Sequence, residues 1–349
     1  PRFLCHTIRA TNSRGWETGS KFIRLMPKPP VVFYGSDAIA LPSLDFFLRE
    51  ASSSCELVGV ITQPDRPSGR GKKMRSNPVK AWAGENGVKI LDPAKPLEPE
   101  VTWLRQEGVV LAMVMAYGHI LSSALLDAPD AGTYNLHGSV LPAYRGASPV
   151  ETALAQGEKE TGATLMRVVS RMDAGPIVDT EITPIAADDD GPRLREKLSV
   201  ACVPLLRRNL SALLAGEATE TPQDEKAATY CRKLRKSDGA LDFYSPAAVL
   251  VRRVSAFRGW PGSWFEVKGV RVKVGSVKVV ESCGEIVPGQ VILPSPREVA
   301  IGTTEGALSL LELQRPGGRM MPTAEFLSGF PLSEGEFVGS QTLSELLLS

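Results

Sequence analysis

Histidine and cysteine are scarce in this sequence, which has three histidines and five cysteines among 349 residues. The cysteines are odd in number and scattered, and no two of them form a C-x-x-C pair. They therefore indicate neither a zinc site nor a disulfide framework, and they are typical of a reducing compartment. The histidines, His6, His119 and His137, stand far apart. Because a metal site needs several ligands close together, we expect no metal.

Long apolar runs and a net charge are also missing. No run of apolar residues approaches the roughly 18 that are needed to cross a bilayer, so we expect no membrane partner. The formal net charge is +1, and it argues neither for nor against nucleic acid, because such binding depends on local clusters of charge. A hydrophobic content of 43% allows a sizeable core, and the length predicts two domains.

Acidic residues are almost absent from the first 30 positions, where Glu17 is the single acid among six Lys and Arg and several Ser and Thr. This composition is typical of an organellar transit peptide. We therefore predict a transit segment at residues 1–29 and a location in the mitochondrial matrix, with the plastid as the alternative. An unstructured basic tail that carries no targeting signal would have the same composition. Because the sequence starts at Pro1, we expect the true start to be missing or removed.

From Pro30 onward, short apolar runs alternate with stretches of helical periodicity. Residues 31–35, 57–61 and 109–115 are apolar throughout, which predicts strands buried on both faces, and residues 38–48 and 194–214 have the period of a helix. Such an alternation predicts an α/β domain with a parallel sheet covered on both sides, over residues 30–217. No G-x-G-x-x-G follows the first strand, so a dinucleotide is not indicated.

The composition changes in the second half of the chain. Residues 218–240 are polar and charged, which predicts a linker. Residues 241–349 begin with a helix-like stretch and continue with short β-rich runs at 264–267, 270–274, 277–280, 289–293 and 307–313. Several short strands separated by Gly and Pro predict a small β-barrel.

The segment with the most chemistry is NLHGSVLPAYRG, residues 135–146. Positions two apart in a strand face the same way, so Asn135 and His137 are expected to project together. An amide donor beside an imidazole suits acyl transfer, because one group stabilises an oxyanion while the other moves a proton. A hydrogen-bonded strand end would show the same spacing.

A second candidate is Asp173, in the run RMDAGPI between two predicted strands. An ordinary turn aspartate that binds its own backbone is one interpretation. A carboxylate placed against an imidazole would instead orient the ring and accept a proton from an attacking amine. Spacing alone does not show that Asp173 meets His137.

These two motifs together resemble the 10-formyltetrahydrofolate-dependent formyltransferases, over roughly residues 30–349. The resemblance implies a Rossmann-like parallel-sheet domain followed by a smaller β-barrel (OB-like) domain, with 10-formyltetrahydrofolate as co-substrate and no metal. It also implies that Asn135, His137 and Asp173 are the catalytic set. The turn at residues 139–142 corresponds to a folate-binding loop made of Ser139, Val140, Leu141 and Pro142. His119 is expected to border the folate pocket, but the matching family position is usually apolar, so we interpret it as incidental.

The acceptor is indicated by a loop at residues 62–75, which has five basic residues against one acid. Its Pro and Gly residues predict an exposed, mobile loop, and plain solvation of the charges is one interpretation. The run QPDRPSGRGKK closely resembles the insertion loop of methionyl-tRNA formyltransferases, and this resemblance implies contact with the acceptor end of a tRNA, first of all by Arg70. The tRNA-binding residues predicted in this loop are Arg66, Arg70, Lys72, Lys73 and Arg75.

The carboxyl-terminal part agrees with a nucleic-acid partner. Between residues 232 and 278 there are 11 Lys or Arg against three acids, a surplus that suits a phosphate backbone, although a solvated basic face remains the alternative. The predicted tRNA contacts in the linker are Arg232, Lys233, Arg235 and Lys236. We therefore expect a monomeric enzyme that formylates initiator methionyl-tRNA. The alternatives are a formyltetrahydrofolate hydrolase, a transferase with a small-molecule acceptor, or a binding protein that has lost catalysis.

Overall fold

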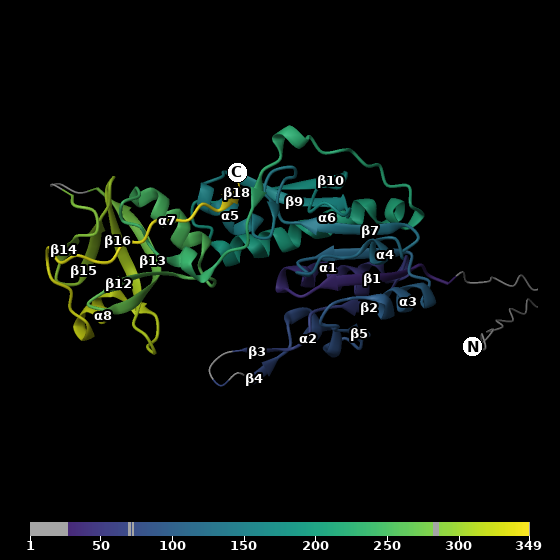
Figure 1. Ribbon diagram of the computed structural model, residues 1–349, viewed down its shortest axis with the longest axis horizontal. Helices are drawn as coiled ribbons and strands as arrows, with labels where there is room; N and C mark the ends of the chain where they lie inside the picture. Colours follow the sequence, from purple (N-terminus) through teal and green to yellow (C-terminus); the bar gives the residue numbers. More distant parts are fainter. Residues whose placement is uncertain (1–26, 69–70, 72, 282–285, 349) are drawn as a thin grey trace, which may run out of the picture.

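The computed structural model describes residues 27–68, 71, 73–281 and 286–348. Apart from residues 27–29, the predicted transit segment lies outside the described residues, as do Arg70 and Lys72. Two bodies follow each other along the chain, a larger one to about residue 215 and a smaller one from about residue 241 (Figure 1).

The first body is built on one seven-stranded sheet with the order β10-β9-β7-β6-β1-β2-β5. Its strands are β1 (Pro30–Gly35), β2 (Glu56–Ile61), β5 (Ile90–Leu91), β6 (Leu111–Met115), β7 (Gly132–His137), β9 (Glu160–Arg167) and β10 (Ile177–Pro184). The five strands from β7 to β5 are parallel, whereas β9 runs antiparallel to β7 and β10 antiparallel to β9. The expected parallel α/β domain is confirmed, with an antiparallel edge that the sequence did not indicate.

Both faces of this sheet are covered, which explains why its strands are apolar throughout. Val31 and Phe33 of β1 pack in one core, whereas Val32 and Tyr34, which point the other way, pack in a second. Helices cover each face. The first core includes residues of α1 (Leu41–Asp45), α2 (Pro78–Glu85), α5 (Pro149–Gln156) and α6 (Gly191–Ala215), and the second includes residues of α3 (Glu98–Gln106) and α4 (Ser123–Leu126).

Two helical segments differ from simple expectation. The predicted helix at residues 38–48 is divided into a 3-10 turn (Ala38–Ala40), α1, a π-helical turn (Phe46–Glu50) and a further 3-10 turn (Ala51–Ser53). Helix α6 is long and apolar enough to cross a membrane by length and composition alone. In the structure α6 packs against α1, β9 and β10, as the core helix of a domain does.

The smaller body is an antiparallel sheet with the order β12-β13-β16-β15-β14, which confirms the expected β domain. The strands are β12 (Ser263–Val267), β13 (Val270–Val280), β14 (Val291–Ser295), β15 (Glu298–Gly302) and β16 (Ala307–Gln314), and β17 (Met321–Pro322) pairs with β16. Helices α7 (Ala247–Ala256) and α8 (Thr323–Gly329) contribute to its core. Residues 337–339 bridge to β12 at Glu266 and to Gln290 just before β14, and so connect the two edges of the sheet.

The segment between the two bodies is bound to the first one along much of its length. Its strand β11 (Tyr230–Cys231) pairs with β8 (Arg145–Gly146) on one side and with β18 (Leu347–Leu348) on the other. The end of the chain therefore leaves the β domain and returns to the first body, as the yellow segment in Figure 1 shows. Helix α7 also packs against α5. The predicted linker at residues 218–240 is thus an ordered segment that is bound to the first body.

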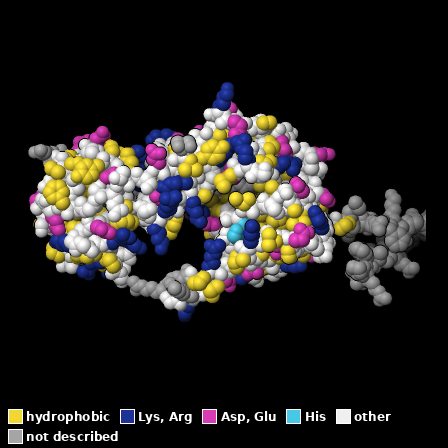
Figure 2. Space-filling view, in the orientation of Figure 1, with side chains coloured by type: hydrophobic (Ala, Val, Ile, Leu, Met, Phe, Trp, Pro, Cys, Tyr) yellow, Lys and Arg dark blue, Asp and Glu magenta, His cyan; other side chains and the backbone are white. Residues whose placement is uncertain are grey.

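The basic loop at residues 62–75 contains an antiparallel hairpin, β3 (Arg66–Ser68) with β4 (Lys73–Arg75). In Figure 1 this hairpin projects from the α/β domain toward the β domain. Figure 2 shows a hollow between the hairpin and the two bodies, with Lys and Arg side chains gathered around it.

Candidate active site

Asn135 and His137 lie at the carboxyl end of β7, where ligands of parallel sheets usually bind. Both point to the same face of the sheet, because they are two residues apart in a regular strand. β7 is held between two neighbours, with Asn135 beside Val114 of β6 and His137 beside Thr164 of β9. The backbone that carries both side chains is therefore fixed by hydrogen bonds on each side.

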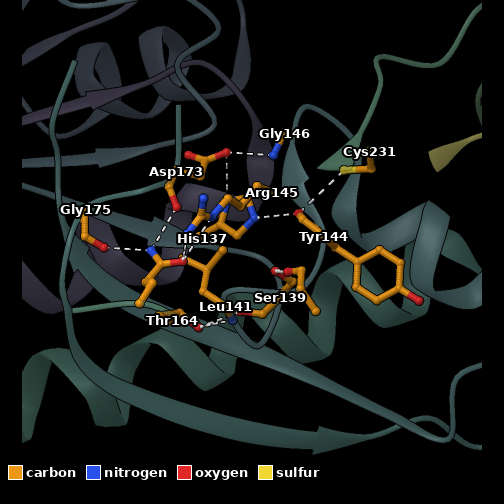
Figure 3. A network of polar contacts seen from close by, with 12 residues as sticks. His137, Ser139, Leu141, Tyr144, Arg145, Gly146, Thr164, Asp173, Gly175 and Cys231 are labelled. Carbon is orange, nitrogen blue, oxygen red and sulfur yellow. Dashed lines mark hydrogen bonds and ion pairs between the residues drawn. The ribbon is translucent and has the colours of Figure 1, made fainter. Parts of the chain in front are cut away.

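The ring of His137 is buried and has a definite orientation. Its Nε2 lies 3.0 Å from the carbonyl oxygen of Tyr144 (Figure 3). Since a carbonyl oxygen only accepts, this contact assigns the proton of the neutral ring to Nε2. Nδ1 faces Asp173, with 3.8 Å between Nδ1 and Oδ2. That separation is too long for a hydrogen bond but close enough for the carboxylate to stabilise a positive charge on the ring.

Asp173 is held from two sides. Its Oδ2 accepts a hydrogen bond of 2.8 Å from the backbone N–H of Gly146, and its backbone is in the left-handed region with φ 50°. Aspartate tolerates this conformation better than most residues. Two residues later, a Cβ on Gly175 would overlap the carbonyl oxygen of Arg167, so only glycine fits there. The predicted meeting of Asp173 with His137 therefore depends on a tightly built turn.

The predicted folate-binding turn has two inward-facing members. Ser139 is fully buried and its Oγ donates to the carbonyl oxygen of Ala143 at 2.6 Å. Leu141 is also buried, and its N–H donates to Thr164 Oγ1 at 3.2 Å. Val140 and Pro142 are half-buried. Contact of this turn with a folate would thus involve Val140, Pro142 and the backbone, and the role of the turn stays a prediction.

Arg145 follows this turn, and its guanidinium is fully buried. Its Nε and Nη2 donate to Gln223 Oε1 at 3.1 and 2.8 Å. Its Nη1 and Nη2 donate to the carboxylate of Glu225 at 3.2 and 3.0 Å. Nη1 also donates to the hydroxyl of Tyr230 at 3.0 Å. Burial alone would lower the pKa of Arg145, but the contacts with Glu225 and Tyr230 outweigh it and keep that pKa above its usual range. A charged Arg145 is therefore stable in this position.

The amide of Gln223 connects this arginine to the catalytic loop. Its Nε2 donates to the carbonyl oxygens of Asp173, at 2.9 Å, and Gly175, at 2.6 Å. Gln223 and Glu225 were missed in the sequence, where they are two polar residues of a polar linker. Gln223 and Glu225 lie far along the chain from the residues that they contact, and no spacing rule predicts contacts over such a separation.

The amide of Asn135 makes no hydrogen bond to another side chain or to the backbone within the described part of the chain, and the residue is half-buried. A polar side chain in that position is available to a ligand. An amide donor, an imidazole and a carboxylate thus converge at the end of β7. This set can hold a developing oxyanion, supply a proton and accept one, which is the chemistry of acyl transfer.

The other predicted residues lie on the linker, on the hairpin and on the loop that follows β6. Lys233, Arg235 and Lys236 are exposed, as are Arg66, Lys73 and Arg75 on the hairpin. Arg232 is instead paired with Asp238 at 2.8 Å. His119 is half-buried, its ring lies edge-on to Tyr117, and its Nε2 has no hydrogen-bond partner among the described residues. Over that same part of the chain, no three His, Cys, Asp or Glu side chains gather as a metal site would need.

The fold and this site define a two-domain acyl-group transferase. Comparisons with known proteins identify the group. The family described as "Formyl transferase" matches residues 31–207, and "Formyl transferase, C-terminal domain" matches residues 233–331. The chain belongs to the formyl transferase family, and it is a formyltransferase.

Two curated relatives align with most of the chain. It is 36% identical to the methionyl-tRNA formyltransferase of Sorangium cellulosum (strain So ce56), and the alignment covers 88% of this chain and 99% of that protein. It is 39% identical to the methionyl-tRNA formyltransferase of Thermus thermophilus, over 88% of this chain and 99% of that protein.

Solved structures share the fold. HypX from Aquifex aeolicus in complex with tetrahydrofolic acid is 17% identical with a TM-score of 0.58, covering 89% of this chain and 50% of that one. An N-formyltransferase from Helicobacter canadensis, in complex with folinic acid and dTDP-3-aminofucose, is 15% identical with a TM-score of 0.58, covering 83% of this chain and 100% of that one.

Proposed function

We propose that this enzyme transfers the formyl group of 10-formyltetrahydrofolate to the α-amino group of methionine carried by initiator tRNA. The observation that carries the proposal is the extent of the similarity to methionyl-tRNA formyltransferases, which runs through both domains and covers 99% of the relatives' length. The family and the folate-bound structural neighbours support a formyl-folate as the donor.

The chemistry assigned to the three residues is direct transfer. The neutral amine attacks the formyl carbon, and a C–N bond forms as the carbonyl oxygen becomes an oxyanion. Asn135 donates to this oxygen through its free amide, and His137 donates from Nδ1 when that nitrogen is protonated. Asp173 takes the proton that the amine loses. The bond from the formyl carbon to N10 then breaks as the protonated Asp173 returns this proton to N10, so that neutral tetrahydrofolate leaves and the carboxylate is regenerated.

The exposed cations support a tRNA as acceptor. Arg66, Lys73 and Arg75 lie on a hairpin that borders the hollow between the domains, and Lys and Arg side chains gather around this hollow (Figure 2). A basic cleft of this kind suits the phosphate backbone of an acceptor stem. Lys233, Arg235 and Lys236 are exposed in the linker and are proposed to add to the same surface.

The test compares three reactions of the full chain with labelled 10-formyltetrahydrofolate: charged initiator tRNA, charged elongator methionyl-tRNA, and no tRNA. The proposal predicts rapid label transfer to initiator methionyl-tRNA, slower transfer to the elongator, and only slow formate release without tRNA. Formate release at the same rate with and without tRNA would instead identify a hydrolase. Transfer to a sugar nucleotide in preference to both tRNAs would identify a small-molecule transferase.

We also propose that the enzyme works in an organelle, with the mitochondrial matrix favoured over the plastid. The support is the basic, acid-poor composition of residues 1–29. A carboxyl-terminal fluorescent fusion of the full chain should enter mitochondria, and the same fusion lacking residues 1–29 should not. An unchanged distribution after the deletion would contradict the proposed address.

A further inference from the structure

The interdomain linker contacts the catalytic loops at several consecutive points. Glu220 accepts hydrogen bonds from Arg167 at 2.6 Å and from Tyr134 at 3.0 Å. Thr221 exchanges two backbone hydrogen bonds of 2.8 Å with Ile177. Further on, Thr229 accepts from the backbone N–H of Arg145. The linker therefore follows the outer side of the same two loops that carry Asp173 and Gly146.

Gln223 is the linker residue whose side chain contacts the backbone of Asp173. Gln223 is half-buried between exposed neighbours. Both hydrogens of its Nε2 are used, one on the carbonyl of Asp173 and one on the carbonyl of Gly175. Its Oε1 accepts two hydrogen bonds from Arg145, so the orientation of the amide is fixed by the charge of the arginine.

Arg145 is itself fixed, because the five N–H donors of its guanidinium all have acceptors on the linker. The backbone N–H of the next residue, Gly146, binds the Asp173 carboxylate. The side chain of Asp173 is thus held by the Arg145–Gly146 strand, and its backbone is held by the same strand through Gln223. Figure 3 shows Asp173 between His137 and the backbone N–H of Gly146.

We propose that Gln223 is a positioning residue for formyl transfer. It acts through Asp173, by holding the turn at residues 173–175, in which Asp173 is left-handed, at the distance from His137 that catalysis requires. The inference rests on the formyl-transfer role proposed for Asp173. It adds a linker residue whose amide is hydrogen-bonded to Arg145, Asp173 and Gly175. A misplacement of about 1 Å in such a group commonly costs roughly a hundredfold in rate.

Two substitutions separate the functions of the amide. Gln223→Ala removes every contact, whereas Gln223→Glu keeps an acceptor for Arg145 but has no donor for the two carbonyls. Both should lower kcat by about 10- to 100-fold, with KM for methionyl-tRNA and for the formyl donor changed by about twofold or less. Glu220→Gln, on the same linker but without contact to Asp173, is the matched control and should keep kcat within about twofold of the wild type.

A double-mutant cycle with Asp173→Asn distinguishes positioning from general support of the fold. If Gln223 acts through Asp173, Gln223→Ala should lower single-turnover rates by no more than about twofold in the Asp173→Asn background. Multiplicative losses in the double variant would overturn the inference, and so would wild-type kcat in folded Gln223→Ala and Gln223→Glu. Circular dichroism and tetrahydrofolate titration confirm that each variant is folded and binds the folate.

The wild-type enzyme is assayed first with charged initiator tRNA, which decides the proposed acceptor on its own. If the wild type does not formylate the tRNA, the proposed function fails, and the Gln223 variants are compared by tetrahydrofolate release from 10-formyltetrahydrofolate. A slower release in the Gln223 variants but not in Glu220→Gln supports the inference, and an unchanged release in the Gln223 variants overturns it.

Discussion

Replacing Asn135 with alanine should lower the rate of formyl transfer while leaving the protein folded. The side chain is half-buried and makes no hydrogen bond to the described residues, so its removal breaks no hydrogen bond that supports β7. The backbone ladder to β6 and β9 stays intact. The effect should therefore fall on the transition state, in which the amide stabilises the oxyanion.

The expected size of this effect is that of one lost oxyanion donor, about a hundred- to thousandfold in turnover, or about 2.7–4 kcal/mol. Single-turnover formylation with enzyme in excess over methionyl-tRNA measures it, since this design isolates the chemical step from product release. KM for the donor should change much less than the rate.

Thr133→Val is the matched control, because Thr133 lies on the same face of the same strand and donates to the carbonyl oxygen of Leu126 at 3.1 Å. The control removes a real hydrogen bond, worth about 1 kcal/mol of stability, but lies away from the reacting atoms. It should transfer the formyl group at the wild-type rate. Near-wild-type rates in Asn135→Ala, or equal losses in both variants, would refute the assignment.

Three further results are expected. Arg70→Ala, in the part of the basic loop outside the described residues, should weaken methionyl-tRNA use and spare slow donor hydrolysis; equal loss of both would mean that the loop does not serve tRNA. Contacts with Arg145 and Arg171 lower the pKa of Glu225 from 4.5 to about 2. The ionised Glu225 therefore adds to the free energy of unfolding above pH 4.5, and this contribution should be lost as the pH drops toward 2. Urea midpoints across that range should fall less in Glu225→Gln than in the wild type. Leu346 is 1% exposed in the core of the α/β domain. Leu346→Ala should therefore lower the free energy of unfolding by about 2–5 kcal/mol. An unchanged thermal midpoint would show that the returning carboxyl-terminal segment is dispensable for stability.

Local patterns in the sequence predicted the parts of the site that depend on local geometry. Asn135 and His137 share a face because side chains alternate along any strand. The approach of Asp173 to His137 has no such basis. Val168 binds the carbonyl of Thr133, four residues before His137, and by Asp173 the chain has returned to the level of His137. This return is set by tertiary contacts with Gly146 and Gln223, which periodicity does not encode.

Counting charges along the sequence overestimated the free cations, because a count ignores partners. Arg253, included in the predicted basic surplus, is buried, with Nη2 donating to the carbonyl oxygen of Asp238. Arg232 is paired with Asp238, and Arg258 with Asp190 and Glu312. The unpaired cations between residues 232 and 278 are therefore fewer than the sequence suggested. Arg232 would have to break its ion pair to contact a phosphate.

In the β domain, a β-bulge made one strand look like two in the sequence. The runs at 270–274 and 277–280 were predicted as two strands, but they form the single strand β13. The register with β16 shifts on both sides of Ser276, next to Gly275. A β-bulge interrupts the two-residue alternation without ending the strand, so the pattern appears broken where the backbone continues.

The product that the full chain forms from labelled 10-formyltetrahydrofolate and charged initiator methionyl-tRNA decides whether the enzyme formylates tRNA-bound methionine. After mild hydrolysis of the aminoacyl ester, we expect the label in N-formylmethionine, with one tetrahydrofolate released for each formyl group transferred. Asn135→Ala should form the same product far more slowly. Recovery of the label only as formate, or on an amine other than that of the tRNA-bound methionine, would contradict the proposed function.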